Sequence, residues 1–148
     1  PMYVVPVAAL LRMTRMEAHE FLQETCELLE FSQRMCDTVM FVSHTWLSTD
    51  HPDPDGVQLG VLQTFCRNLQ RSDRPLRVSW QRELLFGPAQ LAAADLARIK
   101  YVWLDYACIP QAASEESREN RCRAVKYITN YVFNSRFFVV VAPPAMHR

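Results

Sequence analysis

Two short segments hold most of the residue types that could do chemistry in this chain. Each segment follows an apolar run, and together they supply a hydroxyl, an imidazole, an indole, a carboxylate, a phenol, a thiol and an amide. The candidates are Ser43, His44, Trp46, Asp105, Tyr106, Cys108 and Gln111. An imidazole can move protons near neutral pH, a thiol can act as a nucleophile beside a base, and an indole can stack on a nucleobase.

Three of these candidates have two interpretations each. His44 is either an acid, base or ligand contact, or a ring that satisfies a nearby loop carbonyl. Asp105 either orients a substrate hydroxyl or the imidazole, or it caps the turn that follows it, and we favour the turn. Cys108 would complete a thiol, base and orienter set with His44 and Asp105. We favour a small buried apolar role for Cys108, because that is the usual one for cysteine.

Metal and phosphate sites are weakly indicated. His51, Asp53 and Asp55 could supply metal donors with His44 and Cys108, but the spacing matches no standard zinc or calcium loop. We therefore predict no metal and expect Asp55 to cap the following helix. Five arginines within 67–82 either hold phosphates or form a solvated surface, and we favour the surface.

Composition restricts the class of protein. The 148 residues fit one domain, and 16 basic residues balance 16 acidic ones, which argues against a nucleic-acid-binding role. The longest apolar run, 137–146, is half of the roughly 20 residues that a membrane-spanning helix needs. Five cysteines without a CxxC pair indicate free, mostly buried thiols in a reducing compartment, so we expect a cytoplasmic protein. Three glycines leave no phosphate-binding glycine loop, and no cofactor is required.

The elements that must position the candidates are three apolar strands at 38–44, 100–105 and 137–142. Helices are predicted at 57–70 and 89–98, and a third begins after Ser114. We expect this third helix to bury Ala124, Val125, Ile128 and Val132. The segments 46–56, 71–90 and 106–111 are predicted to be irregular because proline, glycine and charge interrupt them.

The N-terminal part is predicted to add one helix. Residues 3–11 are apolar and broken by Pro6, which fits either an extended arm or one helical turn. Thr14 and Glu17 have the spacing of a capping box, so a helix should begin there and run to about residue 34. We divide the chain into this arm and helix at 1–36 and an α/β domain at 37–148.

Strands that alternate with helices predict a parallel sheet of at least three strands with helices on its faces. Ligands of open parallel sheets bind beyond the carboxyl ends of the strands, which is where the candidates lie. The segment 137–142 has neither proline nor charge, unlike a protected edge strand. We therefore expect further strands in a longer protein and regard 37–148 as incomplete at its C-terminus.

The same two segments carry a family resemblance. FVSHTW (41–46) resembles the first strand and loop of Toll/interleukin receptor (TIR)-like domains, and YVWLDYACIPQ (101–111) resembles the W-[IL]-D-x-x-C-I-x-Q signature of heterokaryon-incompatibility (HET) domains. The similarity covers about 37–143. The chain departs from the HET pattern at His44, where tyrosine is usual, and at Pro110, where asparagine is usual.

The resemblance implies a flavodoxin-like sheet and a role in immunity or cell-death signalling, with self-association or binding to other TIR- or HET-like domains. Some TIR domains cleave NAD with a glutamate after the third strand, and the matching position would lie beyond Arg148. Our leading hypothesis is a nucleotide-type pocket, with NAD as ligand or substrate, lined by the strand-end candidates Ser43, His44, Trp46, Asp105, Tyr106 and Gln111. The alternatives are a non-enzymatic interaction module and a cysteine-dependent hydrolase.

Overall fold

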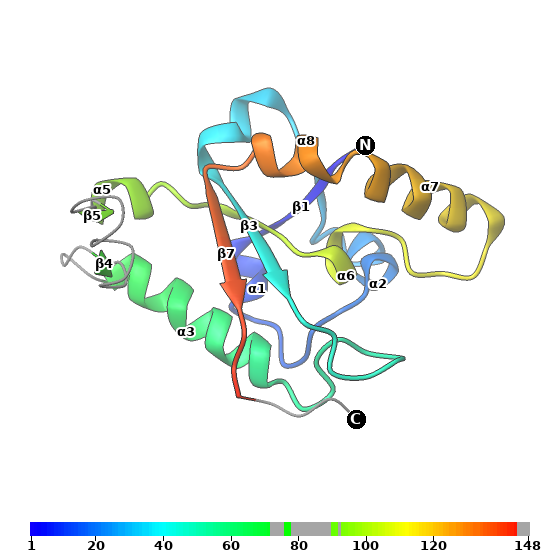
Figure 1. Cartoon of the computed structure of the whole chain (residues 1–148), viewed down its shortest axis with the longest axis horizontal. Helices are drawn as coiled ribbons and strands as arrows, with labels where there is room; N and C mark the ends of the chain where they lie inside the picture. Colours follow the sequence, from blue (N-terminus) through cyan, green and yellow to red (C-terminus); the bar gives the residue numbers. More distant parts are fainter. Residues whose placement is uncertain (72–75, 78–89, 92, 145–148) are drawn as a thin grey trace.

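Three apolar strands form the parallel part of the sheet, as the sequence predicts. The computed structural model describes residues 1–71, 76–77, 90–91 and 93–144 (Figure 1). Strand β3 (Val39–His44) pairs in parallel with β6 (Tyr101–Trp103) on one side and with β7 (Phe137–Val141) on the other. Phe41 stands opposite Trp103 and Phe138 in this register, so one aromatic row crosses the three strands.

Two antiparallel strands extend this parallel part beyond β6, so the sheet is mixed rather than purely parallel. Strand β1 (Tyr3–Pro6) pairs with β6 and also with β2 (Leu29–Glu30), which gives the order β2-β1-β6-β3-β7. The apolar segment 3–11 contains both of the predicted conformations. Pro6 ends the extended strand β1, and helix α1 (Val7–Leu10) begins directly after it. Proline fixes φ near −65° and has no N–H, which suits the start of a helix.

The long N-terminal helix that we predicted is wrong. Helix α2 spans only His19–Glu24, its N-cap is Ala18, and the capping box at Thr14 is not used. The helix ends in a Schellman pattern, in which Cys26 N–H bonds to the Gln23 carbonyl and Glu27 N–H bonds to the Leu22 carbonyl. Cys26 takes the left-handed conformation, with φ of 56°, that glycine usually supplies at this position. Strand β2 and the 3₁₀ helix η1 (Gln33–Thr38) occupy the rest of the expected helix.

Helix α3 (Val57–Arg71) covers one face of the sheet with Leu59, Leu62, Cys66 and Leu69 buried. The predicted start at residue 57 is therefore confirmed. The carboxylate of Asp53 accepts hydrogen bonds from the N–H groups of Gln58 and Leu59, at 3.1 and 2.8 Å. Asp53 is fully buried and caps the first turn of this helix, and the cap predicted at Asp55 stays a prediction.

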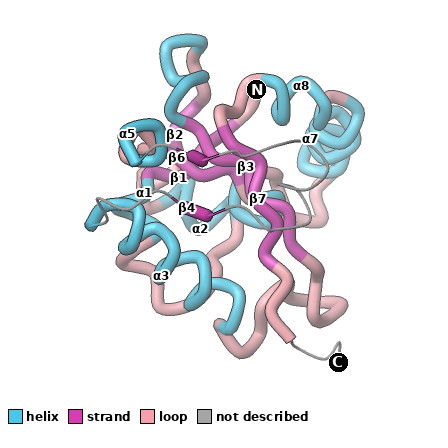
Figure 2. Tube along the Cα trace, turned by 60° about the vertical axis from the view of Figure 1, so that its left-hand side comes forward, coloured by secondary structure: helices cyan, strands magenta, loops and turns pink. Residues whose placement is uncertain are grey.

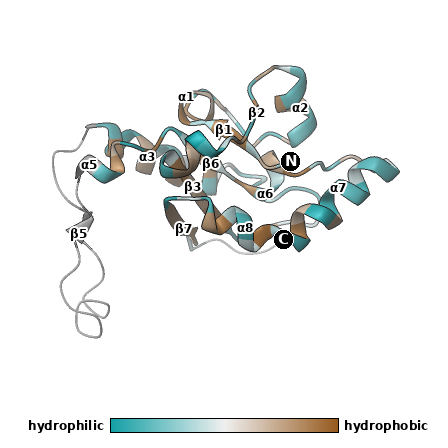
Figure 3. Ribbon diagram, turned by 90° about the horizontal axis from the view of Figure 1, so that it is seen from above, coloured by the Kyte–Doolittle hydropathy of each residue, from teal (hydrophilic) through white to brown (hydrophobic). Residues whose placement is uncertain are grey.

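The helix predicted after Ser114 begins where expected, but it is interrupted and forms two helices. Helix α7 (Glu115–Lys126) has Ser114 as its N-cap, with the Ser114 hydroxyl accepting from Ser117 N–H. Tyr127 separates it from helix α8 (Ile128–Phe133), so the expected single helix is wrong. Only part of the expected apolar face is buried. Ala124 lies in the core, whereas Val125 is 63% exposed. Figure 3 shows that α7 is mostly hydrophilic.

Smaller elements complete the chain. Helix α5 (Ala93–Leu96) forms part of the short helix expected at 89–98, and β4 (Leu76–Arg77) pairs with β5 (Gln90–Leu91) within a segment predicted to be irregular. Helix α6 (Asp105–Cys108) replaces the loop predicted after the second strand. No helix in the described part of the chain combines the length and apolar character needed to cross a membrane.

The sheet lies between two helical layers (Figure 2). Alternate residues of a strand point to opposite faces. Trp103 stacks on Phe41 at 4.2 Å and contacts Tyr131 of α8, which places α8 on the aromatic face. Val42 and Leu104, which alternate with those residues, meet Leu62 of α3 on the other face. This arrangement brings the carboxyl ends of β3 and β6 to one edge of the sheet, where the candidate residues begin.

Candidate functional site

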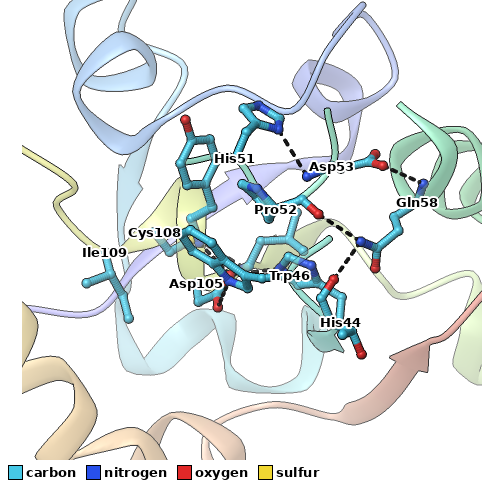
Figure 4. A network of polar contacts seen from close by, with 12 residues as sticks. His44, Trp46, His51, Pro52, Asp53, Gln58, Asp105, Cys108 and Ile109 are labelled. Atoms are coloured by element: carbon cyan, nitrogen blue, oxygen red, sulfur yellow. Dashed lines mark hydrogen bonds and ion pairs between the residues drawn. The ribbon is translucent and has the colours of Figure 1, made fainter. Parts of the chain in front are cut away.

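The carboxylate of Asp105 joins the two candidate segments (Figure 4). Asp105 is the first residue of α6, and His44 is the last residue of β3, the parallel neighbour of β6. The His44 Nε2 lies 2.8 Å from Asp105 Oδ1, and the Trp46 indole N–H donates to Asp105 Oδ2 at 3.0 Å. The prediction that strand ends bring these three residues together is therefore confirmed.

Asp105 is held as a carboxylate. Burial alone would raise its pKa, but the hydrogen bond and charge of His44, the Trp46 indole and the Tyr106 backbone N–H together lower the pKa below the usual aspartate value. The Tyr106 N–H lies 2.6 Å from Oδ1. The side chain remains 35% exposed, so solvent or a ligand can still reach it. Both proposed roles of Asp105 are thus present in one group, because it orients the imidazole and caps the start of α6.

The His44 ring is enclosed. Its side chain is only 2% exposed, and it lines a narrow crevice with Gln58 and the apolar side chains of Met16, Leu62 and Val141. Its Nδ1 has no hydrogen-bond partner among the described residues. The imidazole therefore contacts Asp105 on one side and protein atoms on the other, which fits an anchor more closely than a ligand contact.

The loop between β3 and α3 is fixed by Gln58, which the sequence analysis did not single out, and by His51, which it considered only as a metal donor. The Gln58 amide donates to the carbonyls of Thr45 and Pro52, at 2.7 and 3.1 Å. His51 Nδ1 accepts from the Asp53 N–H at 3.0 Å, which leaves Nε2 to donate to the Met16 carbonyl at 3.0 Å. A glutamine one residue inside a helix carries no sequence signal for this role, so Gln58 could not be identified beforehand.

The Cys108 thiol is bonded to backbone groups and not to the His44 imidazole. It is 4% exposed, and its thiol has backbone partners, with Sγ accepting from Leu104 N–H at 3.5 Å and donating to the Val102 carbonyl at 3.9 Å. Burial raises the pKa of the Cys108 thiol to about 12. The thiol therefore stays protonated at neutral pH, and its recorded partners do not include His44.

The remaining candidates lie around this centre with different accessibility. Tyr106 is buried and meets the Trp46 ring edge to face at 5.7 Å. The side-chain amide of Gln111 donates to the Ile109 carbonyl, and its backbone N–H donates to Glu20. Ser43 and Trp46 are half-buried. Across the residues that the structure describes, no group of three or more histidine, cysteine or acidic side chains is placed to hold a metal.

The cysteines differ from the expectation of mostly buried thiols. All five are free, and Cys66 and Cys108 are buried, but Cys26 and Cys122 are exposed and Cys36 is intermediate. Cys26 is exposed because it occupies the left-handed position after α2, and Cys122 lies on the hydrophilic helix α7. Only two of the five thiols therefore belong fully to the core.

Neither a family model, nor a curated protein, nor a solved structure matches this chain. The chain is an α/β protein with a five-stranded mixed sheet in which β6, β3 and β7 are parallel. Among the strand-end candidates, Asp105, Trp46 and Ser43 combine polarity with partial exposure, whereas His44, Tyr106 and Cys108 have largely enclosed side chains.

Alkylation of the native protein should separate the thiols. Because the thiolate is the reactive form and burial raises the pKa values of Cys66 and Cys108 to about 11 and about 12, these two should react slowly. Peptide mass spectrometry after iodoacetamide at neutral pH should show Cys26 and Cys122 modified at least about a thousandfold faster than Cys108. In denaturant all five should react alike. Equal native rates at Cys108 and Cys122 would contradict the buried thiol.

The variant Asp105→Asn should change how stability depends on pH. The folded pKa of Asp105 lies below the unfolded value of about 3.9, so its stabilisation is complete above that value and is lost as pH falls through the folded pKa. Urea unfolding across this acidic range should show a shallower loss of stability for Asp105→Asn than for wild type. Asp50→Asn, at an exposed loop position, should keep the wild-type slope. The same dependence of stability on pH in all three proteins would contradict a lowered pKa of Asp105.

Proposed function

We propose that this chain is an interaction domain of a signalling protein and that it assembles with a second copy of itself through the edge of β7. The TIR/HET resemblance of 41–46 and 101–111 supports self-association as the function. The five free thiols support a reducing compartment. The observation that carries the proposal is the apolar, uncovered edge of the sheet at β7.

Strand β7 has the features of a strand that accepts a partner. Among the residues that the structure describes, it is the last strand in the sheet order and pairs with β3 on one side only. Its side chains are all phenylalanine or valine, and Phe138 and Val140 are 55% and 63% exposed. Proteins commonly protect such edges with charge, proline or a bulge, and an unprotected edge is a template for pairing with another chain.

An apolar groove runs beside this strand. It has a volume of about 410 Å³ and lies between α3 and the segment 139–144. Val61 and Phe65 of α3 form one wall, and Val61 is 47% exposed. A contiguous exposed apolar surface of this kind marks an interaction site in a protein of ordinary composition. The groove adds side-chain contacts to the backbone pairing that β7 offers.

The strand is self-complementary, which favours a second copy as its partner. Antiparallel pairing about a two-fold axis at Val139 would place Phe138 of one copy opposite Val140 of the other, twice. Aromatic and β-branched pairs across strands are stabilising. The net charge of zero adds no overall repulsion between two copies. Isologous pairing of this type closes as a dimer and leaves no further β7 edge.

Val140→Lys should weaken this assembly. A lysine on the edge strand places a charge inside the proposed contact, while its exposure in the monomer makes the change tolerable for folding. Light scattering after size exclusion, over a concentration series, should show wild type shifting from monomer to dimer and Val140→Lys remaining monomeric.

Val125→Lys supplies the matched control, because Val125 is also 63% exposed but lies on α7. It should dimerise as wild type does, and circular dichroism should show the same fold for all three proteins. A wild type that stays monomeric at every concentration would overturn the proposal. Equal loss of assembly in both variants would also reject β7 as the interface.

A second candidate is the nucleotide-type pocket at the strand ends. The supporting observation is the carboxylate of Asp105, which is ionised, partly exposed and hydrogen-bonded to the half-buried Trp46 indole. Such a carboxylate can accept a ribose hydroxyl, and the indole can stack on a base. The TIR resemblance supports NAD as the ligand, with hydrolysis in a longer protein. The enclosed thiol of Cys108 gives no support to a cysteine-dependent hydrolase.

Titration with NAD tests this candidate directly. Binding at the strand ends should quench tryptophan fluorescence in a saturable manner, and Trp46→Phe should remove most of the response. Trp103→Phe should preserve it, because Trp103 is 1% exposed within the sheet. Absence of saturable quenching, or an unchanged response in Trp46→Phe, would exclude a nucleotide site at Trp46.

A further inference from the structure

The apolar groove beside β7 is continuous with the edge that the proposed dimer shares. We call it the α3 groove, and its volume is about 410 Å³. Val61, Leu62 and Phe65 of α3 form one wall, and the segment 139–144 forms the other (Figure 1). All of the described residues that line it are apolar or proline. An occupant of this groove must therefore be apolar as well, because a polar group would lose its hydrogen bonds there.

The side chains of β7 divide between the two faces of the sheet. Phe138 continues the aromatic row on the face that α8 covers. Because side chains alternate along a strand, Phe137, Val139 and Val141 point to the opposite face. Val141 accordingly shares a crevice with Leu62 of α3. Phe137 therefore lies on the same face of the sheet as the α3 groove.

The proposed pairing carries this division into the second copy. In an antiparallel pair of strands, residues directly opposite each other point to the same face of the sheet. A two-fold axis at Val139 would therefore stand perpendicular to the sheet, and α3 of both copies would lie on one face. The same axis sets Val141 of one copy opposite Phe137 of the other, and both of these side chains point to the α3 face.

Phe137 of the second copy is the side chain that this register brings to the α3 groove. Val141 is itself a groove residue, and directly opposite residues of two strands have Cβ atoms about 4.5–5.5 Å apart. A phenylalanine ring reaches beyond this spacing, so it would extend past Val141 toward Val61. Within its own copy, Phe137 is half-buried and does not line the groove. The groove of each copy is therefore left for the ring of the other.

We infer that the α3 groove binds the Phe137 side chain of a second copy of this chain, so that each dimer contains two identical contacts of α3 with the partner's β7. This inference rests on the proposed β7 dimer and gives α3 a part in it. Val61 is 47% exposed in the single chain, and the contact would cover it with an aromatic ring. Covering exposed apolar surface is favourable, and the two-fold axis provides the same contact twice.

Val61→Glu tests the groove without any change in β7. A carboxylate at this position would meet the phenyl ring of the second copy and lose its contact with water, which is costly. Because each dimer contains two such contacts, at about tenfold each, the dissociation constant from sedimentation equilibrium should rise about a hundredfold. Val57→Glu is the matched control, since Val57 is 42% exposed on the first turn of α3 but does not line the groove. This control should dimerise as wild type does.

The β7 dimer and the groove contact fail in different ways. A wild type that stays monomeric contradicts the dimer, and the groove contact falls with it. A wild type that dimerises with the same dissociation constant as Val61→Glu leaves the β7 edge in place but rejects the α3 groove as the binding site for Phe137. Equal weakening by Val61→Glu and Val57→Glu also rejects the groove, because the effect would not be specific to its lining.

Cross-linking between copies identifies the contact itself. Val61→Cys and Phe137→Cys are made in separate proteins, and both proteins carry Cys26→Ser and Cys122→Ser to remove the exposed thiols. A short bis-maleimide then takes the place of the missing ring. Peptide mass spectrometry should show a link between positions 61 and 137 in the mixture of the two proteins and in neither protein alone.

Val57→Cys, mixed with Phe137→Cys in the same way, supplies the control and should give no such link. An equal yield from positions 57 and 61, or no link in a mixture that dimerises, overturns the inference. If Phe137→Cys does not fold, the dissociation constants of Val61→Glu and Val57→Glu still decide the matter.

Discussion

The carboxylate of Asp105 is the contact on which the arrangement of the strand ends depends. It stands where β6 becomes α6, and it accepts hydrogen bonds from His44, Trp46 and the Tyr106 backbone. One ionised group therefore joins the neighbouring strand, the loop after that strand and the next helix. A half-buried charged group of this kind is stabilising while its donors are in place, so its hydrogen bonds couple the three segments.

The three parallel strands were predictable because a continuous apolar run leaves a strong mark on sequence, and in β3 that run reflects burial on both faces. The segments 38–44, 100–105 and 137–142 are nearly continuous apolar runs, and parallel pairing follows from the helices between them. The limits of the first helix were not predictable in the same way. The helix ends where Cys26 takes a left-handed conformation, and a cysteine does not indicate such an end in a sequence as a glycine would. Strand β2 is only two residues long, which is too short to give a sequence pattern.

The candidate site shows a similar division. A general rule about parallel strand ends was enough to bring His44, Asp105 and Trp46 together. It could not determine which atoms remain accessible, because that depends on tertiary packing around each ring. His44 proves to be enclosed and bonded to Asp105, whereas His19, which no motif marks, is buried with its ring against Tyr3. Histidines with different surroundings look alike in a sequence because the distinguishing contacts come from elements far away along the chain.

The two edges of the sheet differ in the surface that they present. Strand β7 ends the sheet on one side with exposed phenylalanine and valine, whereas the two-residue strand β2 ends it on the other side, next to β1. Three strand spacings, roughly 14 Å, separate β1 from β7. The pairing of two copies through β7 that we propose would therefore leave β1 and β2 of each copy away from the shared edge.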